Sequence, residues 1–464
     1  VARRIMRMTG TQGYDMRPGN RYFLHNVRAF LDRPGECHVD GAAGKMRVWP
    51  RTGARIEVST AENVITVQGT AQRPVRNLHF AGLDISLAQG DAVLFDAVED
   101  CSLRFCLIEN ARQDGIGIRG AARRVEVYGN EIRQHGQHGV SLQGLGPPGP
   151  DVNFGHIVAN NHIHHCGRLV GHGYGVRIDQ TGKNKIVHNH IHHMPRYGTT
   201  IKGVRYQVLR EQVEGVSFAN RHDFIHSRQN LLAYNHIHDV NMDSQDTGAM
   251  ESWGPGRDNV YDHNLIHDTG NDRFDLQSGI YLDDASDYFT VTNNIIYNVL
   301  GTGGDQCIFA KGIGNRIENN ILVVGPTNVA AIRSMTMGGE RTDGHHYTRN
   351  VIYFEPPPAP PDGAFGERLR DLHAVGMTLK WQVDIPARGE YALWLRYTTS
   401  VDMGEKTDLR VDDGAPMPLA GLLATGGWNH WEWRQVGVLA LENGTRRLTW
   451  VNRDGGGIDL DALV

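Results

Sequence analysis

The sequence predicts an all-β protein in which a parallel β-helix is followed by a small β-sandwich. Three observations support this fold class. A short phrase with one Asn recurs through the first three quarters of the chain, apolar and polar residues alternate within these phrases, and the pattern changes after a proline-rich stretch. The 464 residues are enough for one repeat array and one further domain.

The recurring Asn has a nearly constant spacing. Successive copies are 26 to 31 residues apart, except for an interval of 46 residues between Asn189 and Asn235. One coil of a β-helix takes roughly 20 to 30 residues, so the long interval predicts an insertion, at 205–229. We expect the Asn to adopt left-handed geometry at its turn and to hydrogen-bond along the column. The copies are Asn130, Asn161, Asn189, Asn235, Asn264, Asn294, Asn320 and Asn350.

Phrases that begin with glycine predict the strands of one face. In residues 115–119, 139–143, 175–179, 198–202 and 279–283, the second and fourth positions are mostly apolar, and the third and fifth are mixed or polar. Because side chains alternate along a strand, the second and fourth should point inward and the others outward. An antiparallel propeller is the alternative fold, but no blade phrase of that fold occurs.

Composition excludes several classes of protein. The formal net charge of -5 does not favour a nucleic-acid partner, and no run of 18 apolar residues is present, so we expect no membrane span. No signal peptide is visible and the chain starts at Val1, so we expect a processed or trimmed form.

Cysteine and histidine usage argues against a metal centre. The five Cys are odd in number and form no CxxC pair, which predicts neither a zinc site nor a disulfide scaffold. Cys106 takes the place of the ladder Asn and is expected to be buried packing. Most of the 24 His follow the repeat just after the Asn, so we interpret them as turn or surface residues.

The pattern predicts three segments: residues 1–355 as the β-helix, 356–367 as a proline-rich linker and 368–464 as the sandwich. Beyond the linker, strand-like runs and turn clusters alternate roughly every dozen residues. The phrases GEYALWLRY, GGW and IDLDAL there resemble a jelly-roll carbohydrate-binding module. Near the start, residues 21–50 have the turn LDRPGE with strand-like pieces on either side. They resemble the entry segment of bacterial β-helix glycosidase-like proteins.

Acidic residues on neighbouring coils form the candidate site. Aligning Met250 with Ile280 places Glu251 and Trp253 on the outward face beside Tyr281 and Asp283. Asp246 then lies in the turn before this strand, and Asp284 follows Asp283. The outward positions of preceding coils add Arg177, Asp179 and Lys202. Coils stack roughly 4.8 Å apart, so these groups should converge on one patch.

This set of residues suits the cleavage of a glycosidic bond. One carboxyl group protonates the leaving oxygen, and a second activates water or attacks the sugar. Crowded carboxylates raise one pKa, and a Trp offers an apolar face to a sugar ring. The alternative is structural: Asp283 and Asp284 would be a solvated strand end, and Asp246 an Asx turn. A purely structural role explains Glu251 less well, because strands are poor in Glu. Arg177 and Lys202 would neutralise a substrate carboxylate or only pair with Asp179 and its neighbours.

The phrases Asp246-Thr-Gly-Ala-Met and Gly279-Ile-Tyr-Leu-Asp-Asp284 resemble those of the right-handed parallel β-helix hydrolases of the pectate-lyase-like superfamily, especially bacterial plant-glycan glycosidases. The resemblance spans roughly residues 20 to 355. It implies a glycoside hydrolase with Asp246 and Asp283 or Asp284 as the carboxyl pair. The sequence departs from the pattern at Glu251, where an aromatic residue is expected, so Glu251 is kept as a catalytic candidate.

We therefore predict a secreted or periplasmic bacterial enzyme that hydrolyses a plant- or algal-type polysaccharide or oligosaccharide, without a cofactor. Asp246, Asp283, Glu251 and Asp284 are the catalytic candidates, and Arg177, Asp179, Lys202, Trp253 and Tyr281 would bind the sugar. Two alternatives stay open. One is a polysaccharide lyase with a base such as Lys202 and Ca²⁺ held by Asp283 and Asp284. The other is an adhesin that only binds glycans.

Overall fold

The computed structural model describes residues 24, 26–335, 341–355, 372, 375–427 and 430–463. The chain divides into two compact units, Val1–Ser59 and Thr60–Val464. In the first unit, η1 (Arg28–Phe30) precedes the antiparallel hairpin of β1 (Cys37–Asp40) and β2 (Lys45–Val48). The prediction of strands on both sides of the turn at 31–36 was wrong, because both strands follow that turn. Residues 21–23 and 25 of the predicted entry segment lie outside the described residues.

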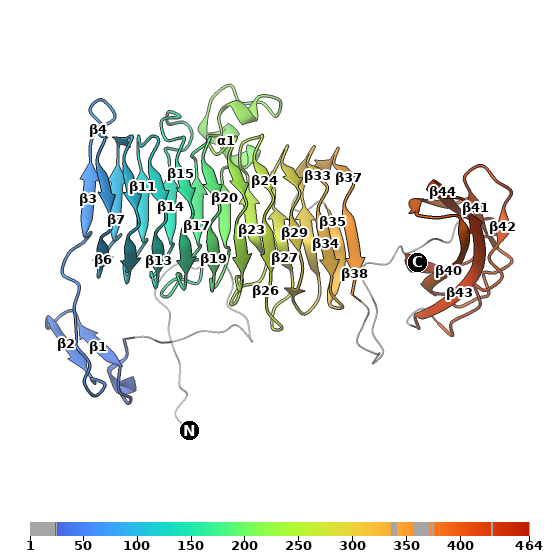
Figure 1. Cartoon of the computed structure of the whole chain (residues 1–464), viewed down its shortest axis with the longest axis horizontal. Coiled ribbons are helices and arrows are strands. Elements are labelled where there is room, and N and C mark those ends of the chain that lie inside the picture. The colour runs from blue at the N-terminus through green and yellow to red at the C-terminus, as the bar shows by residue number, and fades with distance from the viewer. Residues whose placement is uncertain are drawn as a thin grey trace. The chain divides into compact units, whose positions relative to one another are not determined.

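The second unit begins with a parallel β-helix of three sheets, each with ten parallel strands (Figure 1). We call them the long-strand sheet, the histidine sheet and the third sheet. The long-strand sheet contains β3 (Ile65–Gln68), β7 (Val93–Asp96), β11 (Ile116–Arg119), β14 (Val140–Gln143), β17 (Val176–Asp179), β20 (Thr199–Lys202), β23 (Thr247–Trp253), β27 (Gln277–Leu282), β31 (Asp305–Ala310) and β35 (Asn328–Ser334).

The other two sheets supply the remaining walls of each coil. The histidine sheet contains β6 (Asp84–Ser86), β10 (Leu107–Glu109), β13 (Glu131–Arg133), β16 (His162–His164), β19 (His190–His192), β22 (His236–His238), β25 (Leu265–His267), β29 (Ile295–Ile296), β34 (Ile321–Val324) and β38 (Val351–Phe354). The third sheet contains β5 (His79–Ala81), β9 (Ser102–Arg104), β12 (Glu126–Tyr128), β15 (Ile157–Ala159), β18 (Lys185–Val187), β21 (Leu231–Ala233), β24 (Val260–Asp262), β28 (Thr290–Thr292), β33 (Arg316–Glu318) and β37 (His346–Thr348).

Three short parallel pairs bridge neighbouring coils at their turns. They are β4 (Val75–Arg76) with β8 (Val98–Glu99), β26 (Thr269–Gly270) with β30 (Val299–Leu300), and β32 (Gly312–Ile313) with β36 (Thr342–Asp343).

The core of the β-helix is a column of apolar side chains from all three sheets, and the predicted inward positions are confirmed. Ile116 and Ile118 of β11 are fully buried, as are Ile280 and Leu282 at the end of β27. Because the side chains alternate, residues between them project from the other side of the sheet. The long-strand sheet therefore combines an apolar inner side with a chemically varied outer side.

The predicted Asn column is confirmed, but its predicted backbone geometry was wrong. In each rung the Nδ2 of one Asn donates to the Oδ1 of the next; from Asn235 to Asn264 the distance is 3.0 Å. The left-handed residue is the one before the Asn, such as Tyr234 (φ 56°) and His263 (φ 52°). The Asn can then direct its amide into the core. Cys106 takes this place in an earlier coil, is buried as predicted, and its backbone N–H donates to Asn130.

A second Asn column, which the sequence analysis missed, lies at another turn. Asn184 donates to Asn230 over 2.9 Å, and Asn230 donates to Asn259 over 2.9 Å. In the next coil Phe289 takes the place of the Asn, and its backbone N–H donates to the side chain of Asn315. Two amide columns therefore hold the turns of the central coils in register.

The predicted insertion is confirmed between β20 and β21. It contains α1 (Tyr206–Gln212) and η2 (Arg221–Asp223) (Figure 1). Arg221 anchors it through a buried ion pair with Asp287, 2.5 Å long, and His222 lies 3.2 Å from the same carboxylate. These contacts lower the pKa of Asp287 in spite of its burial. The insertion is thus fixed to the turn that follows β27.

The histidines of the repeats lie mostly in strands, so their assignment to turns was wrong, but most of their side chains are partly exposed, as expected of surface residues. His162, His190 and His236 open β16, β19 and β22, and each strand also ends in a His. Burial and neighbouring imidazoles lower the pKa of His190 to about 4 and that of His192 to about 3. These rings are therefore neutral at physiological pH.

After the β-helix, two antiparallel sheets form the predicted sandwich. One contains β39 (Thr378–Ile385), β44 (Gly444–Asn452), β41 (Thr407–Val411) and β42 (Met417–Pro418), and the other contains β43 (Glu432–Leu441), β40 (Gly389–Thr398) and β45 (Asp459–Leu463). Trp450 and Tyr397 are fully buried in its core. The predicted linker at 356–367 lies outside the described residues, so the domain boundaries stay predictions.

The five cysteines are free, and four of them are buried. Among the residues described, no helix is both long enough and apolar enough to span a bilayer.

Candidate functional site

The candidate site lies on β23 and β27, which are neighbours in the long-strand sheet. Met250 pairs with Ile280 and Glu251 with Tyr281, so the predicted register is confirmed. On the other side of β23, Lys202 of β20 pairs with Trp253. Residues far apart in the sequence are therefore adjacent because the coils stack in parallel register.

Asp246 and Asp283 are linked through the side chains of Tyr281 and Lys311. The Tyr281 hydroxyl donates to Oδ1 of Asp246 over 2.9 Å and accepts from Nζ of Lys311 over 2.9 Å. Lys311 also donates to Oδ1 of Asp283 over 2.6 Å and to Oδ1 of Asp284 over 3.2 Å. We call these five residues the acid cluster. It places three carboxyl groups around one ammonium and one phenol.

The carboxyl groups of the acid cluster are accessible to solvent, whereas its phenol ring is buried. Asp246 is exposed in the turn before β23, at a φ of 53° that Asp tolerates. The side chains of Asp283 and Asp284 are 17% exposed, whereas Tyr281 is 1% exposed. Burial and the charges of Asp283 and Asp246 raise the pKa of Tyr281, so its hydroxyl keeps its proton. Solvent therefore reaches the carboxyl groups but not the phenol ring.

Glu251 is buried and forms an ion pair with Lys202. It is 1% exposed, Thr200 donates to one carboxylate oxygen, and Nζ of Lys202 lies 2.5 Å from the other. Burial raises the pKa of Glu251, against the opposing effect of Lys202. The carboxylate thus fixes the ammonium of Lys202, whose Nζ lies 5.0 Å from the centre of the Tyr197 ring.

Arg177 and Asp179 are separate from the acid cluster, whereas Trp253 is connected to it through Arg205. The guanidinium of Arg177 pairs with Asp179 on its own strand, with Nη2 2.5 Å from Oδ2. No hydrogen bond or ion pair in the described part of the chain connects these two to the acid cluster. Trp253 contacts Arg205, whose guanidinium lies 5.3 Å from the ring centre. Both Arg177 and Lys202 pair with an acid, and their role toward a substrate carboxylate stays a prediction.

The sequence analysis missed Lys311 and Arg205. Lys311 follows β31 and is 4% exposed, while Arg205 begins the insertion and lies 3.3 Å from Asp284. One signal could have found Lys311: it occupies the place after the strand where the preceding coil carries Asp283. No pattern in the sequence indicated Arg205, because its contact depends on how the insertion folds back.

A small depression lies between the insertion and the turn after β27. The turn contributes Ala285 and Asp287, which lie one and three residues after Asp284 of the acid cluster. Its lining is Tyr206, Phe218, Arg221, Ala285, Asp287, Ile313 and Arg341.

A second acidic group lies further along the long-strand sheet. Asp91 pairs with Arg119 over 2.6 Å, and Asp114 lies 3.5 Å from the same guanidinium. Burial, followed by the charge of Asp91, raises the pKa of Asp114 to about 6. Asp114 Oδ1 also accepts from the backbone N–H of His138. The contacts of Asp114 connect neighbouring coils, but its buried negative charge destabilises the folded state at neutral pH.

We expect Asp114→Asn to flatten the pH dependence of stability. Because the folded pKa lies above the ordinary value of 3.8, this group favours folding below about pH 4 and loses that contribution as pH rises through about 6. The amide keeps the acceptor for His138 and removes the charge. Relative to the wild type, the variant should gain about 1–3 kcal/mol between pH 4 and 7.5, measured by urea unfolding. Parallel stability profiles for the two proteins would contradict this.

With this geometry established, comparisons with known proteins identify the parts of the chain. Residues 48–213 match the model of the right handed beta helix region, and residues 370–464 match carbohydrate binding module (family 35). The chain therefore contains a right-handed parallel β-helix and a carbohydrate-binding-module domain. No curated protein matches the chain in sequence.

Solved structures provide distant similarities. A glycoside hydrolase is 16% identical, with 70% of this chain and 58% of that chain covered and a TM-score of 0.46. The A-module of the mannuronan C-5 epimerase AlgE4 from Azotobacter vinelandii is 11% identical, covers 64% of this chain and 88% of that chain, and has a TM-score of 0.42. A family 35 carbohydrate binding module from Clostridium thermocellum is 23% identical over 24% of this chain and 82% of its own, with a TM-score of 0.19. The chain thus spans 58% of the length of that glycoside hydrolase.

Proposed function

We propose that the protein is a glycoside hydrolase whose reaction takes place at the acid cluster. The observation that carries the proposal is the link from Asp246 through Tyr281 and Lys311 to Asp283. Two accessible carboxyl groups on one wall, with different neighbours, are the requirement for cleaving a glycosidic bond.

The neighbours of the two carboxyl groups favour a division of roles. Asp283 faces the ammonium of Lys311, which stabilises a carboxylate that activates water or attacks the sugar. The Asp246 side chain has no ion pair with a described residue, and its carboxylate accepts from the neutral Tyr281 hydroxyl. We assign Asp246 as the proton donor to the leaving oxygen and Asp283 as the base or nucleophile.

The remaining residues would position the substrate. The Trp253 ring, held by Arg205, offers an apolar face to a sugar. Asp284, which contacts Lys311 and Arg205, would orient both cations. Glu251 is a positioning residue in this proposal, because it is enclosed and holds Lys202. The substrate would be a plant- or algal-type polysaccharide or oligosaccharide, and a secreted or periplasmic location would fit it.

A glycan panel tests the reaction class. The protein is incubated with neutral and uronate-containing plant and algal glycans, with and without EDTA, and reducing ends and unsaturated-product absorbance are followed. The proposal predicts new reducing ends without ultraviolet absorbance and without loss in EDTA. Absorbance from an unsaturated product would instead establish the lyase alternative, in which Asp283 and Asp284 would hold Ca²⁺. Binding without cleavage of any glycan would favour an adhesin.

The sandwich offers a second place for sugar contact. In the antiparallel pair of β40 and β43, Trp394 lies opposite Gln435 and Arg396 lies opposite Trp433. The two tryptophans therefore lie on one face of the sheet, and each is 41% exposed. Trp450 in the same domain is fully buried, so exposure is not general for Trp in the sandwich.

We expect Trp394→Ala combined with Trp433→Ala to weaken glycan binding by about tenfold, because stacking of a sugar on an aromatic face is lost. Affinity electrophoresis on the polymer cleaved by the wild type measures the effect. Hydrolysis of a short oligosaccharide should be unchanged, since the acid cluster is intact. Equal retention of variant and wild type would exclude this face as a binding surface.

A further inference from the structure

The histidine sheet carries two parallel columns of imidazole rings outside the acid cluster. The first column contains His162, His190 and His236, and the second contains His164, His192, His238 and His267. Rings within a column stack face to face, as for His190 and His236, whose centres are 4.9 Å apart with planes 7° from parallel. The coil spacing thus holds identical donors at fixed intervals.

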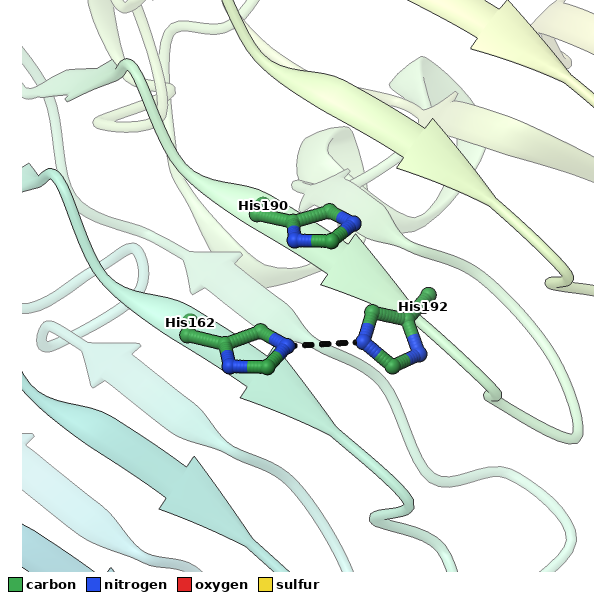
Figure 2. A group of neighbouring side chains, drawn as sticks. All are labelled: His162, His190 and His192. Atoms are coloured by element: carbon green, nitrogen blue, oxygen red, sulfur yellow. Dashed lines mark hydrogen bonds between the residues drawn. The ribbon is translucent and has the colours of Figure 1, made fainter.

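The columns meet along diagonals through their Nε2 atoms. His190 Nε2 lies 2.7 Å from His238 Nε2, and His236 Nε2 lies 2.7 Å from His267 Nε2. Figure 2 shows the preceding rung, in which the rings of His162 and His190 are parallel and His162 Nε2 lies 2.8 Å from His192. At such a distance one nitrogen of each pair carries a proton and the other accepts it.

The tautomer of the second column is fixed by carboxylates in two rungs. Nδ1 of His238 lies 2.8 Å from Oδ2 of Asp239, and Nδ1 of His267 lies 2.6 Å from Oδ2 of Asp268. A carboxylate only accepts, so Nδ1 is the donor and the Nε2 lone pair faces the first column. A carboxylate behind a histidine is the arrangement that orients imidazole ligands toward metal ions.

We propose that His190, His236 and His238 form a binding site for a divalent transition metal ion such as Zn²⁺. One nitrogen from each ring lies within 4.8 Å of the other two, and all three side chains are partly exposed. Imidazole-only ligand sets suit Zn²⁺, Cu²⁺ and Ni²⁺ rather than Ca²⁺ or Mg²⁺. The ion would take the place of the proton between His190 and His238, and that proton would move to Nδ1 of His190. His236, whose Nε2 donates to His267, would bind through its unprotonated nitrogen.

Binding of the ion requires the rings to move. Zn–N bonds of roughly 2.0–2.1 Å in a tetrahedral site separate two ligand nitrogens by roughly 3.3 Å, so the 2.7 Å pair has to open by roughly 0.6 Å. His236 also has to rotate out of its stack with His190, because the lone pairs of two rings only 7° from parallel do not converge on one ion. Solvent supplies the fourth ligand. The neighbouring set of His162, His190 and His192 shares His190 but has His193, not a carboxylate, behind His192. We therefore assign the ion to the set that Asp239 supports.

The test is titration of the full-length, EDTA-dialysed protein with Zn²⁺ by calorimetry, and electron paramagnetic resonance of the Cu²⁺-loaded wild type. We expect saturable zinc binding, splitting from three nitrogen ligands, and an unfolding midpoint raised by at least about 2 °C. His190→Ala and His238→Ala should each weaken binding at least 100-fold, and Asp239→Asn about tenfold. His263→Ala, which removes an exposed His outside the columns, should change nothing.

Two results would overturn the proposal. Fewer than two nitrogen ligands on Cu²⁺ in the wild type would exclude the site without reliance on any variant. A loss of zinc affinity in His192→Ala but not in His238→Ala would exclude the assigned set. Equal thermal unfolding of His190→Ala and wild type in EDTA serves as the folding control.

Discussion

Asp246→Asn and Asp283→Asn should each lower kcat/KM at least 10³-fold on the glycan that the wild type cleaves. Asn keeps the size and left-handed tolerance of Asp but can neither donate a carboxylic acid proton nor act as a base, and general acid–base catalysis contributes about 10²–10⁴-fold. Tyr281 and Lys311 can still donate to the amide oxygen, so stability should change little. Initial rates and thermal unfolding measure the two effects.

Asp258→Asn is the matched control for Asp246→Asn. Asp258 also lies in an exposed turn with left-handed backbone, at a φ of 65°, and its partner is the neighbouring Arg257. Its replacement should leave kcat/KM within about twofold, because it does not touch the acid cluster. Activity of either acid-cluster variant within tenfold of the wild type would remove that residue from the mechanism.

Asn235→Leu should destabilise the β-helix by about 4 kcal/mol. The Asn235 side chain accepts from the backbone and the amide of Asn189 and donates to the Ile186 carbonyl and to Asn264. Leucine leaves these buried groups without partners, and each such loss costs about 1–3 kcal/mol before relaxation. Chemical unfolding followed by circular dichroism measures the change.

Asn350→Leu provides a graded comparison for this prediction. Asn350 is a partly buried rung that accepts from Asn320 and donates to the Ile317 carbonyl. Water can replace some of these contacts, so the loss should be at most half of that at Asn235. Equal losses at the two positions would show that burial of the column does not set its contribution.

The sequence allowed the repeat and the strand register to be predicted because both follow from local periodicity. A period of two fixes which side of a strand is buried, so pairing Met250 with Ile280 also aligned Glu251 with Tyr281. The Asn column could be predicted for the same reason. Its backbone geometry could not, because the positive φ belongs to the residue before the Asn, and the type of that residue varies, as with Tyr234 and His263.

Contacts between side chains that are distant in the sequence could not be predicted. Lys311 reaches Tyr281 and Asp283 only because β31 follows β27 in the stack, and Arg205 reaches Asp284 because the insertion folds back. The histidines were assigned to turns because they follow the Asn, although the turn precedes that Asn and the His opens the next strand. In each case the position of the residue in the repeat could be predicted from the sequence, but not the residues that it meets in the folded structure.

The most direct test of the account is a crystal structure of the Asp246→Asn variant with an oligosaccharide of the cleaved glycan bound. We predict a glycosidic oxygen within hydrogen-bond distance of the side chain at position 246, with Asp283 facing the same sugar from the other side. A sugar bound elsewhere on the chain, with the acid cluster unoccupied at saturating oligosaccharide, would contradict the assignment of this wall as the catalytic site.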